Sequence, residues 1–277
     1  MTCIGLMYPG AMGASVGAAA CSNAHTVLWA STGRTASTWA RARRANLEDA
    51  GTVAALVKAS EIVLSVCPPH AAEEVASEVV QLGFSGVYVE CNAISPDRTR
   101  FIQRIVEDAG AHYVDGGIIG GPAWTREAKT RLYLSGPRAE EVATCFAGSP
   151  LETPVISDRI GAASALKMGY AAFTKGTTAL LTAILGLVEK EGVRAELARQ
   201  WGDAFTTQTV RRVCANTAKA WRFVGEMHEI AATFQGAGLP GGFHQAAAEV
   251  YERLATFKDH PEPPAIESVL EALLKGE

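Results

Sequence analysis

The sequence predicts an α/β domain over residues 1–157, with a mostly parallel, doubly wound sheet, followed by an all-α domain over residues 158–277. Two observations predict this division. Up to about residue 157, short apolar runs alternate with helical stretches at the spacing of strand–helix–strand units, which is typical of a parallel sheet. After Asp158 such runs stop, and apolar residues recur at the three- and four-residue spacing of a helix.

The expected elements of the first domain follow directly from these runs. Strands are expected at 3–7, 26–30, 61–66, 86–90, 112–116, 131–136 and 153–157. Helices are expected between them, at 11–22, 35–45, 70–82, 95–109 and 138–147. The second domain is expected to begin with one long helix over 161–190, and then to continue with helices at 194–203, 205–228, 229–236, 241–257 and 265–275.

Length and composition restrict the class of protein. The chain has 277 residues, of which 48% are hydrophobic and 19% charged, values typical of a globular protein. The net charge of -4 gives no electrostatic reason to expect a nucleic-acid partner. Polar residues interrupt each apolar window and the N-terminus lacks a signal pattern, so we expect no membrane span. Six scattered cysteines indicate reduced thiols and a cytoplasmic protein, and no spacing predicts a metal site.

A glycine-rich stretch follows the first apolar run. Residues 4–13 read I-G-L-M-Y-P-G-A-M-G, close to the dinucleotide fingerprint G-x-G-x-x-G. Gly10 is expected to let the backbone approach a pyrophosphate, and Gly13 to let the helix pack tightly on the sheet. The first glycine position holds Tyr8, which precedes Pro9 and is therefore expected to be extended. The predicted cofactor-binding residues here are Met7, Tyr8, Pro9, Gly10, Ala11, Met12 and Gly13.

The end of the second expected strand bears on the choice of cofactor. An NAD site places an acidic residue there, but residues 29–35 read W-A-S-T-G-R-T. Ser31, Thr32 and Arg34 instead offer hydroxyls and a guanidinium, which suit a 2′-phosphate. We therefore expect NADP(H) as the preferred cofactor and NAD(H) as the alternative. Three arginines on the next helix, Arg41, Arg43 and Arg44, are expected mainly to form a solvated basic face.

Two further loops follow the carboxyl ends of strands, where ligands bind in such sheets. The loop V-C-P-P-H at 66–70 places Cys67 and Pro68 there, and the loop E-C-N-A-I-S-P at 90–96 contributes Asn92. These loops are expected to hold the nicotinamide half of the cofactor. Two roles fit Asn92 equally well: a hydrogen bond to the cofactor, or a turn-forming asparagine.

Four stretches together resemble a known family. They are the glycine-rich stretch at 4–13, D-G-G-I-I-G-G-P at 115–122, G-A-A-S-A-L-K-M-G-Y at 161–170 and G-E-M-H-E-I-A at 225–231. In this order they are similar to the β-hydroxyacid dehydrogenase superfamily, which includes 3-hydroxyisobutyrate and 6-phosphogluconate dehydrogenases. Imine reductases share its architecture. The resemblance implies a Rossmann domain, an all-α domain that forms a homodimer, and a catalytic lysine at Lys167.

The helical period supports a site near Lys167. The apolar stripe of the long helix centres near Tyr170, Phe173, Thr177 and Ile184. Lys167 lies on its shoulder and Lys175 on the opposite face. A lysine on the shoulder can be partly desolvated, which lowers its pKa toward the range useful for acid–base catalysis. Tyr170, one turn further on, is expected to share that role or to bind substrate.

The chain also departs from the family pattern around the substrate. A serine position holds Ile119 and a proline position holds Gly117, while the family's asparagine and second lysine fall on Ala171 and His228. Donors for a carboxylate are thus missing, and the pocket is expected to be more apolar. The predicted substrate-binding residues are Ile118, Ile119, Gly120, Trp124, Phe173, Trp221 and His228.

These observations predict an enzyme with a small-molecule substrate. The leading hypothesis is hydride transfer between NADP(H) and a CH–OH or C=O carbon, with Lys167 as general acid and base. Reduction of an imine is the alternative, favoured by the missing carboxylate donors and opposed by the lysine. A third hypothesis is a nucleotide-binding sensor without catalytic activity.

Overall fold

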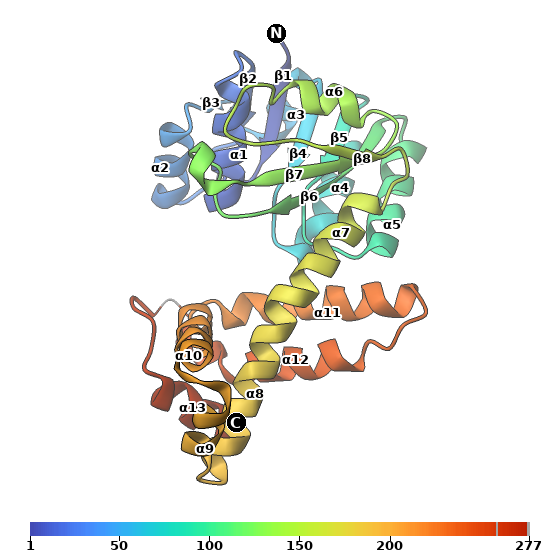
Figure 1. Cartoon of the computed structure of the whole chain (residues 1–277). Coiled ribbons are helices and arrows are strands. Elements are labelled where there is room, and N and C mark those ends of the chain that lie inside the picture. The colour runs from blue at the N-terminus through green and yellow to red at the C-terminus, as the bar shows by residue number, and fades with distance from the viewer. Residues whose placement is uncertain (259, 276–277) are drawn as a thin grey trace. The chain divides into compact units, whose positions relative to one another are not determined.

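The computed structural model describes residues 1–258 and 260–275 (Figure 1). The chain divides into two compact units, Met1–Lys167 and Met168–Glu277. The division falls later than residue 157, where the sequence places the end of the first domain. The reason is that Asp115 of the sheet accepts hydrogen bonds from the backbone N–H groups of Gly161 and Ser164, so the start of the long helix belongs to the first unit.

The first unit contains an 8-stranded sheet in the order β3-β2-β1-β4-β5-β6-β7-β8. Only the β6–β7 pair is antiparallel. The predicted α/β class with a mostly parallel sheet is confirmed. The strands are β1 (Cys3–Met7), β2 (Thr26–Trp29), β3 (Glu48–Asp49), β4 (Ile62–Ser65), β5 (Val87–Glu90), β6 (His112–Ile119), β7 (Arg131–Ser135) and β8 (Val155–Ser157).

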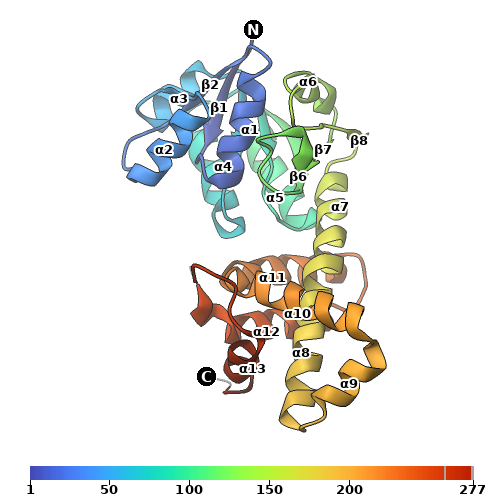
Figure 2. The ribbon, with the colours of Figure 1, turned by 60° about the vertical axis from the view of Figure 1, so that its left-hand side comes forward.

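Helices cover both faces of this sheet (Figures 1 and 2). On one face, α1 and α6 pack over a core that includes Ile4, Leu6 and Val89. On the other, α3, α4 and α5 pack over a core that includes Tyr88 and Tyr113. The helices of this unit are α1 (Ala11–Cys21), α2 (Ala36–Arg44), α3 (Val53–Ala59), α4 (Ala72–Gln81), α5 (Pro96–Asp108) and α6 (Ala139–Thr144), with 3-10 turns at Pro69–Ala71 and Arg126–Ala128.

Two short elements of this unit are absent from the sequence prediction. Strand β3 has 2 residues, too few to form an apolar run. Helix α3 has 7 residues and buries only Leu56 and Val57. Two adjacent buried residues do not show the three- and four-residue spacing by which a helix is recognised in a sequence. Its start does carry a signal, because the Thr52 side chain accepts a hydrogen bond from the Ala55 N–H as an N-cap.

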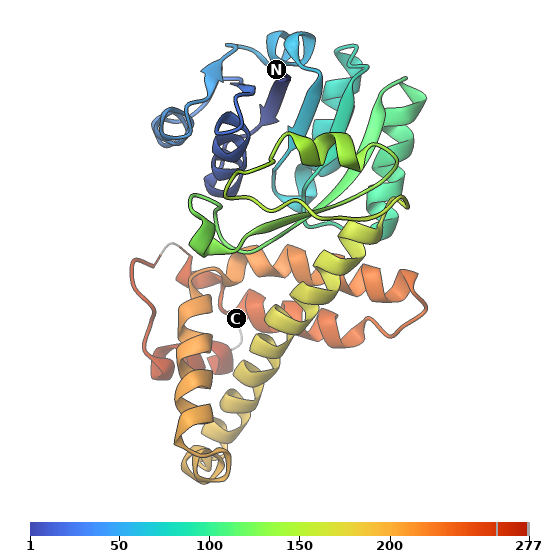
Figure 3. The same cartoon turned by 45° about the horizontal axis from the view of Figure 1, so that its top comes forward.

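A row of polar residues crosses the sheet where the parallel strands end. Ser65, Glu90, Asp115 and Ser135 are successive register partners on β4, β5, β6 and β7, and all four are buried. Directly opposed residues share a face of a sheet, so these side chains lie side by side. Asp115 is the member that continues into the next element, because it binds the first turn of α7 (Ala162–Ala171), seen at the edge of the sheet in Figure 3.

The second unit is helical over its described residues, as predicted. Its helices are α8 (Thr177–Lys190), α9 (Arg194–Trp201), α10 (Asp203–Thr217), α11 (Ala220–Gly236), α12 (Gly242–Arg253) and α13 (Ile266–Lys275), with a 3-10 turn at Ala255–Phe257. Helices α11 and α12 pack side by side (Figures 1 and 2). The predicted single helix over 205–228 is wrong: α10 ends at Thr217, and α11 begins at Ala220 and continues through 236.

The long helix contains a π-helical segment, Ala172–Gly176, between α7 and α8. A π turn changes the phase of the residues that follow, so one period of about 100° does not describe the whole helix. The predicted apolar stripe is wrong at two positions: Tyr170 is 47% exposed and Phe173 67%. The buried face consists of small and aliphatic residues, namely Met168, Ala171, Thr178, Ala179, Leu181, Thr182 and Leu185.

Polar contacts from neighbouring helices stabilise the π segment. Arg212 of α10 donates from Nη2 to the Thr174 carbonyl at 2.6 Å, and the Tyr251 hydroxyl of α12 donates to the Lys175 carbonyl at 2.7 Å. Lys175 itself forms a 2.5 Å ion pair with Glu226 of α11. Lys175 is therefore half-buried in the helical unit, although the sequence places it opposite the predicted apolar stripe.

The helical stretch Ala162–Lys190 is long and apolar enough to cross a membrane by length and composition. Core helices of proteins that do not enter a membrane can have the same length and composition. Here α8 packs against α10, α12 and α13, and Ala179 and Leu185 are buried by these neighbours. The stretch is thus weak evidence for a span, and the absence of a membrane partner stays a prediction.

We predict that Asp115→Asn destabilises the protein, because the substitution removes a buried charge that accepts several hydrogen bonds. The free energy of unfolding should fall by about 2–3 kcal/mol. The control is Asp97→Asn, whose exposed carboxylate pairs with Arg100 and should change stability by less than about 1 kcal/mol. Urea unfolding followed by circular dichroism measures both, and equal effects would contradict the anchoring role of Asp115.

Candidate functional site

The glycine-rich loop begins with an unusual backbone conformation at Tyr8. Its φ is 63°, in the left-handed region that favours glycine. The expectation that Tyr8 is extended is therefore wrong. The first glycine of the fingerprint makes a tight turn at this point, and here tyrosine adopts a glycine-like φ. The Gly10 N–H closes the turn on the Tyr8 carbonyl at 2.7 Å.

Gly10 and Gly13 meet different requirements. Gly10 is the N-cap of α1, and a Cβ added to it would have no atom within 4 Å, so its surroundings are open. No side chain caps α1 and its first turn has no acidic residue, which leaves N–H groups and the positive end of the helix dipole for an anion. A Cβ on Gly13 would lie 2.9 Å from the Tyr8 carbonyl oxygen, so this glycine does allow close packing.

Arginines surround this loop. The Arg34 guanidinium stacks over the Tyr8 ring at 4.1 Å, and its buried Nε has no hydrogen-bond partner among the described residues. Arg41 donates from Nε to the Pro9 carbonyl at 3.0 Å, so it braces the loop. This corrects the expectation that Arg41 belongs to a solvated face. Arg43 is exposed, as expected.

Ser31 and Thr32 form the turn that carries Arg34. The Arg34 N–H donates to the Ser31 carbonyl at 3.0 Å. Thr32 donates from both its N–H and its hydroxyl to the Gly51 carbonyl, at 2.9 and 2.7 Å. The hydroxyl proton of Thr32 is therefore used within the fold. Arg34 is left as the group of this turn best suited to bind a phosphate.

Asn92 connects the two loops expected to hold the nicotinamide half. Its Oδ1 accepts from the Cys67 N–H at 2.5 Å, and its Nδ2 donates to the Ser65 hydroxyl at 3.0 Å and to the Cys67 sulfur at 3.2 Å. Both amide protons are thus satisfied inside the protein. Burial, reinforced by Glu90, raises the pKa of the Cys67 thiol to about 12. Cys67 is therefore a neutral thiol, held in place by Asn92.

The predicted substrate residues of the first unit differ in burial and surroundings. Ile118 is only 6% exposed and belongs to the core, because its side chain faces the α1 and α6 side of the sheet. Ile119 is half-buried at the end of β6. Gly120 has φ 129°, and a Cβ there would lie 2.8 Å from Thr130 Cα. Gly120 thus has a structural reason to be glycine.

Trp124 lies near α1, the helix that follows the glycine-rich loop. The Arg44 guanidinium of α2 stacks over its ring at 4.2 Å, and the neighbouring Ala123 N–H donates to the Ser15 hydroxyl of α1 at 2.9 Å. Trp124 is thus tied to the helices next to the expected phosphate site. Arg44 is exposed, as expected, and also contacts this ring.

Lys167 is half-buried in α7 and lies over β6. A Cβ added to Gly117 would lie 3.0 Å from Lys167 Cβ and 2.7 Å from the Ala163 carbonyl oxygen. Any side chain at position 117 would push the helix off the strand. The glycine in the family's proline position is therefore what allows α7 to place Lys167 close to β6.

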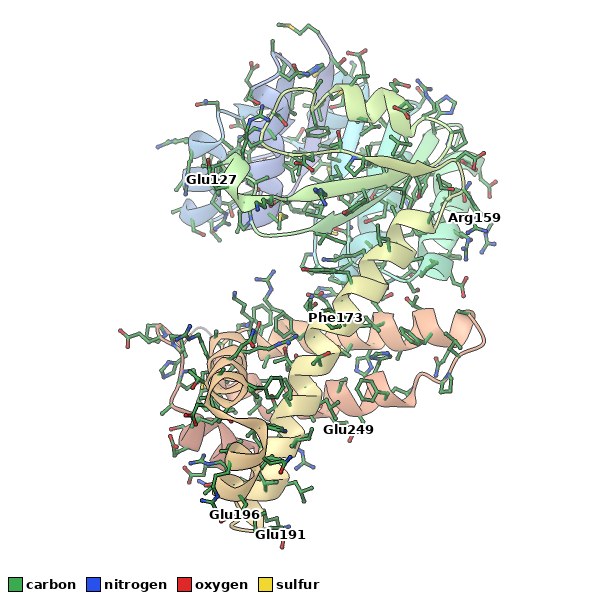
Figure 4. All side chains as sticks on the ribbon, in the orientation of Figure 1. Glu127, Arg159, Phe173, Glu191, Glu196 and Glu249 are labelled. Carbon is green, nitrogen blue, oxygen red and sulfur yellow. The ribbon has the colours of Figure 1, made fainter. Side chains whose placement is uncertain are left out.

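The remaining predicted residues belong to the second unit. Tyr170 and Phe173 are exposed on the long helix, three residues apart. Figure 4 shows Phe173 on this helix. Trp221 and His228 lie on α11, seven residues and hence about two turns apart, on one exposed face. The Lys258 ammonium lies 4.4 Å from the Trp221 ring centroid. Among residues 1–258 and 260–275, no three His, Cys, Asp or Glu side chains are grouped to hold a metal ion.

The sheet order, the glycine-rich turn and the uncapped α1 define a protein with an NAD(P)-binding dehydrogenase fold. Residues 1–146 match the NAD binding domain of 6-phosphogluconate dehydrogenase, and the chain belongs to this family. It is thus a member of the β-hydroxyacid dehydrogenase superfamily, as its four motifs indicate. Residues 188–254 match a domain of unknown function, DUF1932.

One curated relative is an uncharacterized 28.5 kDa protein in the 7S RNA 5′ region of Methanothermus fervidus. It is 32% identical over 143 residues, which cover 51% of this chain. The match spans about half the length of that protein, 53%.

Solved structures share the fold over nearly the whole chain. A conserved hypothetical protein from Sinorhizobium meliloti 1021 has a TM-score of 0.71 at 23% identity and covers 100% of this chain and 97% of its own. The 3-hydroxyisobutyrate dehydrogenase of Mycobacterium tuberculosis has a TM-score of 0.69 at 18% identity, and the match covers 99% of each chain. The reductive aminase of Aspergillus terreus, solved with NADPH and ethyl levulinate, has a TM-score of 0.58 at 17% identity. The match covers 98% of this chain and 99% of the aminase chain. At these identities the likeness shows the fold.

We predict that Tyr8→Gly leaves the dissociation constant of NADPH within about tenfold of the wild type, because glycine readily adopts the positive φ of this turn. The matched control is Tyr8→Ala, which also removes the ring from Arg34 but keeps the strained conformation. Tyr8→Ala should be less stable than Tyr8→Gly by about 1 kcal/mol in thermal or urea unfolding. Complete loss of NADPH binding by Tyr8→Gly would show that the tyrosine ring, rather than the glycine pair, defines the site.

Proposed function

We propose that the protein is an NADP(H)-dependent oxidoreductase that transfers a hydride between the nicotinamide and a CH–OH or C=O carbon of a small, partly apolar substrate. One observation carries this proposal. Met7, which precedes the glycine-rich loop, lies in the same row across the sheet as Asp115, and Lys167 packs over β6 two residues beyond that row. The expected phosphate site and Lys167 therefore share the carboxyl edge of the parallel strands, where this fold binds ligands.

The residues at this edge fit a dinucleotide. The uncapped start of α1 would receive the pyrophosphate, and Arg34, with its partnerless Nε, would bind the 2′-phosphate. The bound cofactor supplies the hydride chemistry. Lys167 would donate a proton to the substrate oxygen during reduction and accept it during oxidation. Tyr170, on the same helix, would share the proton transfer or bind the substrate.

The surroundings of the substrate are proposed to be apolar. Ile119 and Ala171 stand where the family has a serine and an asparagine, and Tyr170 and Phe173 expose large aromatic surfaces. These exposed side chains, with Leu180 and Leu187 of α8, also support a homodimer formed through the helical unit. We further propose a cytoplasmic location, since the cysteines are free thiols.

Imine reduction is the second candidate function. The missing carboxylate donors favour it, and the fold is shared with a reductive aminase that binds NADPH. Lys167 opposes it, because the imine-reducing relatives that the sequence resembles place an aspartate or tyrosine near this position. A panel of small hydroxyacids and cyclic imines, assayed by NADPH absorbance in both directions, separates the two. Turnover of imines alone would make the second candidate the correct one.

We predict that Lys167→Ala reduces turnover by at least about a hundredfold on the best substrate of that panel, because a general acid–base group contributes on the order of 10²–10⁴. The dissociation constant of NADPH, measured by fluorescence, should stay within about threefold. Lys175→Ala is the matched control, a lysine of the same helix that pairs with Glu226. Its kcat should fall less than that of Lys167→Ala. Turnover of Lys167→Ala within tenfold of the wild type would show that Lys167 is not the acid–base group.

We predict that Arg34→Gln weakens NADPH binding by about 10–100-fold, as expected for the loss of one or more charge-assisted hydrogen bonds to phosphate. NADH, which lacks the 2′-phosphate, should bind with little change. Arg43→Gln, at an exposed arginine of the following helix, provides the control. Tighter binding of NADH than of NADPH by the wild type, or equal loss of both in Arg34→Gln, would exclude the assignment.

A further inference from the structure

Two carboxyl groups lie side by side in the interior of the first unit. Glu90 ends β5 and Asp115 is its register partner on β6, and both are 0% exposed. Their side chains therefore share one face of the sheet. Two like charges so close together in a buried environment repel each other, and one of the pair then retains its proton.

The hydrogen bonds identify which carboxyl is ionised. Asp115 accepts from the Ser135 hydroxyl at 2.9 Å, from the Ser164 hydroxyl at 2.6 Å, and from the N–H groups of Gly161 and Ser164 at 2.9 and 3.1 Å. The Thr99 hydroxyl lies at 3.4 Å. These donors, and the start of α7, stabilise a negative charge. Asp115 is therefore the ionised member of the pair.

Glu90 is poorly satisfied by comparison. Its Oε1 accepts one hydrogen bond, from the Asn92 N–H at 2.8 Å, and its buried Oε2 has no partner among the described residues. A bare oxygen on a neutral carboxyl costs one unmade hydrogen bond, whereas a bare oxygen on a buried carboxylate costs the solvation of a charge. Glu90 is thus the protonated member. Burial raises its pKa to about 8; the Asn92 N–H bond opposes this, Asp115 raises it further, and Arg98 lowers it.

The other titratable groups around Glu90 do not supply a charge that would take the place of its proton. Arg98 of α5 is a cation that lowers the pKa of Glu90, and Glu73 of α4 pairs with Arg98 at 2.7 Å. The remaining groups have a pKa raised mainly by burial and stay neutral: the thiols of Cys67 and Cys91 and the phenols of Tyr88 and Tyr113.

Glu90 is connected to the expected cofactor loops through Asn92. Glu90 accepts the Asn92 N–H, and the Asn92 side chain in turn accepts the N–H of Cys67 and donates to Ser65. The loop after β4 is therefore held by the loop after β5, and the latter by Glu90. A charge on Glu90 would be relieved by moving the side chain away from Asp115 or by admitting water, and either change releases Asn92.

We propose that protonated Glu90 is a positioning residue that, through Asn92, holds the loop at Cys67–Pro68 in the arrangement that binds the dinucleotide, so that loss of the Glu90 proton at alkaline pH weakens cofactor binding. The inference rests on the proposed function, because it takes this loop to be part of the cofactor site. It assigns Glu90 no contact with substrate or cofactor.

The direction of the pH effect follows from the pKa. The folded-state pKa of about 8 lies above the ordinary value of 4.5, so the protonated folded state is favoured at low pH and its advantage is lost as the pH rises to about 8. If the dinucleotide binds only the protonated form, its apparent dissociation constant is divided by the protonated fraction. It should then increase by about fivefold between pH 8 and pH 9, and by nearly tenfold for each further pH unit.

The experiment is a fluorescence titration of the full chain with NADPH at pH values from about 6.5 to 9.5. The wild type should lose affinity by about fivefold between pH 8 and pH 9. Glu90→Gln, a neutral isostere, should bind like the wild type at pH 7 and lose affinity much less above pH 8. Glu74→Gln, an exposed carboxylate of α4, is the matched control and should follow the wild-type profile.

Proton uptake provides a second readout that needs no variant. Calorimetric titration of the wild type with NADPH at pH 8.5, in two buffers of different ionisation enthalpy, should detect uptake of more than about half a proton per cofactor bound. A flat wild-type affinity profile with no proton uptake would overturn the role of Glu90 and leave the proposed function standing. A Glu90→Gln profile as steep as that of the wild type would do the same. Failure of the wild type to bind NADPH or NADH at pH 7 would overturn both.

Discussion

The hydrogen bonds of Asp115 are the interaction on which the candidate site depends. This buried carboxylate joins the sheet to the start of the long helix, because it accepts the N–H groups of Gly161 and Ser164. The helix then runs over Gly117, where the absence of a side chain lets Lys167 lie close to β6. One charge and one missing Cβ therefore determine where the proposed acid–base group sits relative to the strand ends.

Much of the fold could be predicted from the sequence because its signals are local. The seven expected strands all occur, since each is an apolar run between turns, and Gly13 packs closely as the fingerprint requires. Elements decided by tertiary contacts could not be predicted. The π segment at Ala172–Gly176 depends on Arg212 and Tyr251, which are distant in sequence. The helical period therefore predicted burial of Tyr170 and Phe173, which are exposed.

The candidate site shows the same division between local and distant causes. The glycine pair could be recognised from its spacing, and the assignment of Arg34 to the 2′-phosphate stays a prediction. The φ of Tyr8 could not, because the residue before a proline favours extended backbone, and here the turn closed by Gly10 overrides that preference. The role of Arg41 could not be predicted either, because its partner, the Pro9 carbonyl, comes from a segment that only the fold brings near α2.

The polar row across the sheet links these observations. Most strand ends in a parallel sheet are apolar because they are buried on both faces, whereas here Ser65, Glu90, Asp115 and Ser135 follow one another under the loops. Each of these side chains accepts a hydrogen bond from a segment beyond the strand ends. Ser65 and Glu90 accept from Asn92, and Asp115 and Ser135 accept from N–H groups at the start of α7. The row thus fixes the loops that the cofactor would contact and the helix that bears Lys167. A change of charge within it would act on both at once.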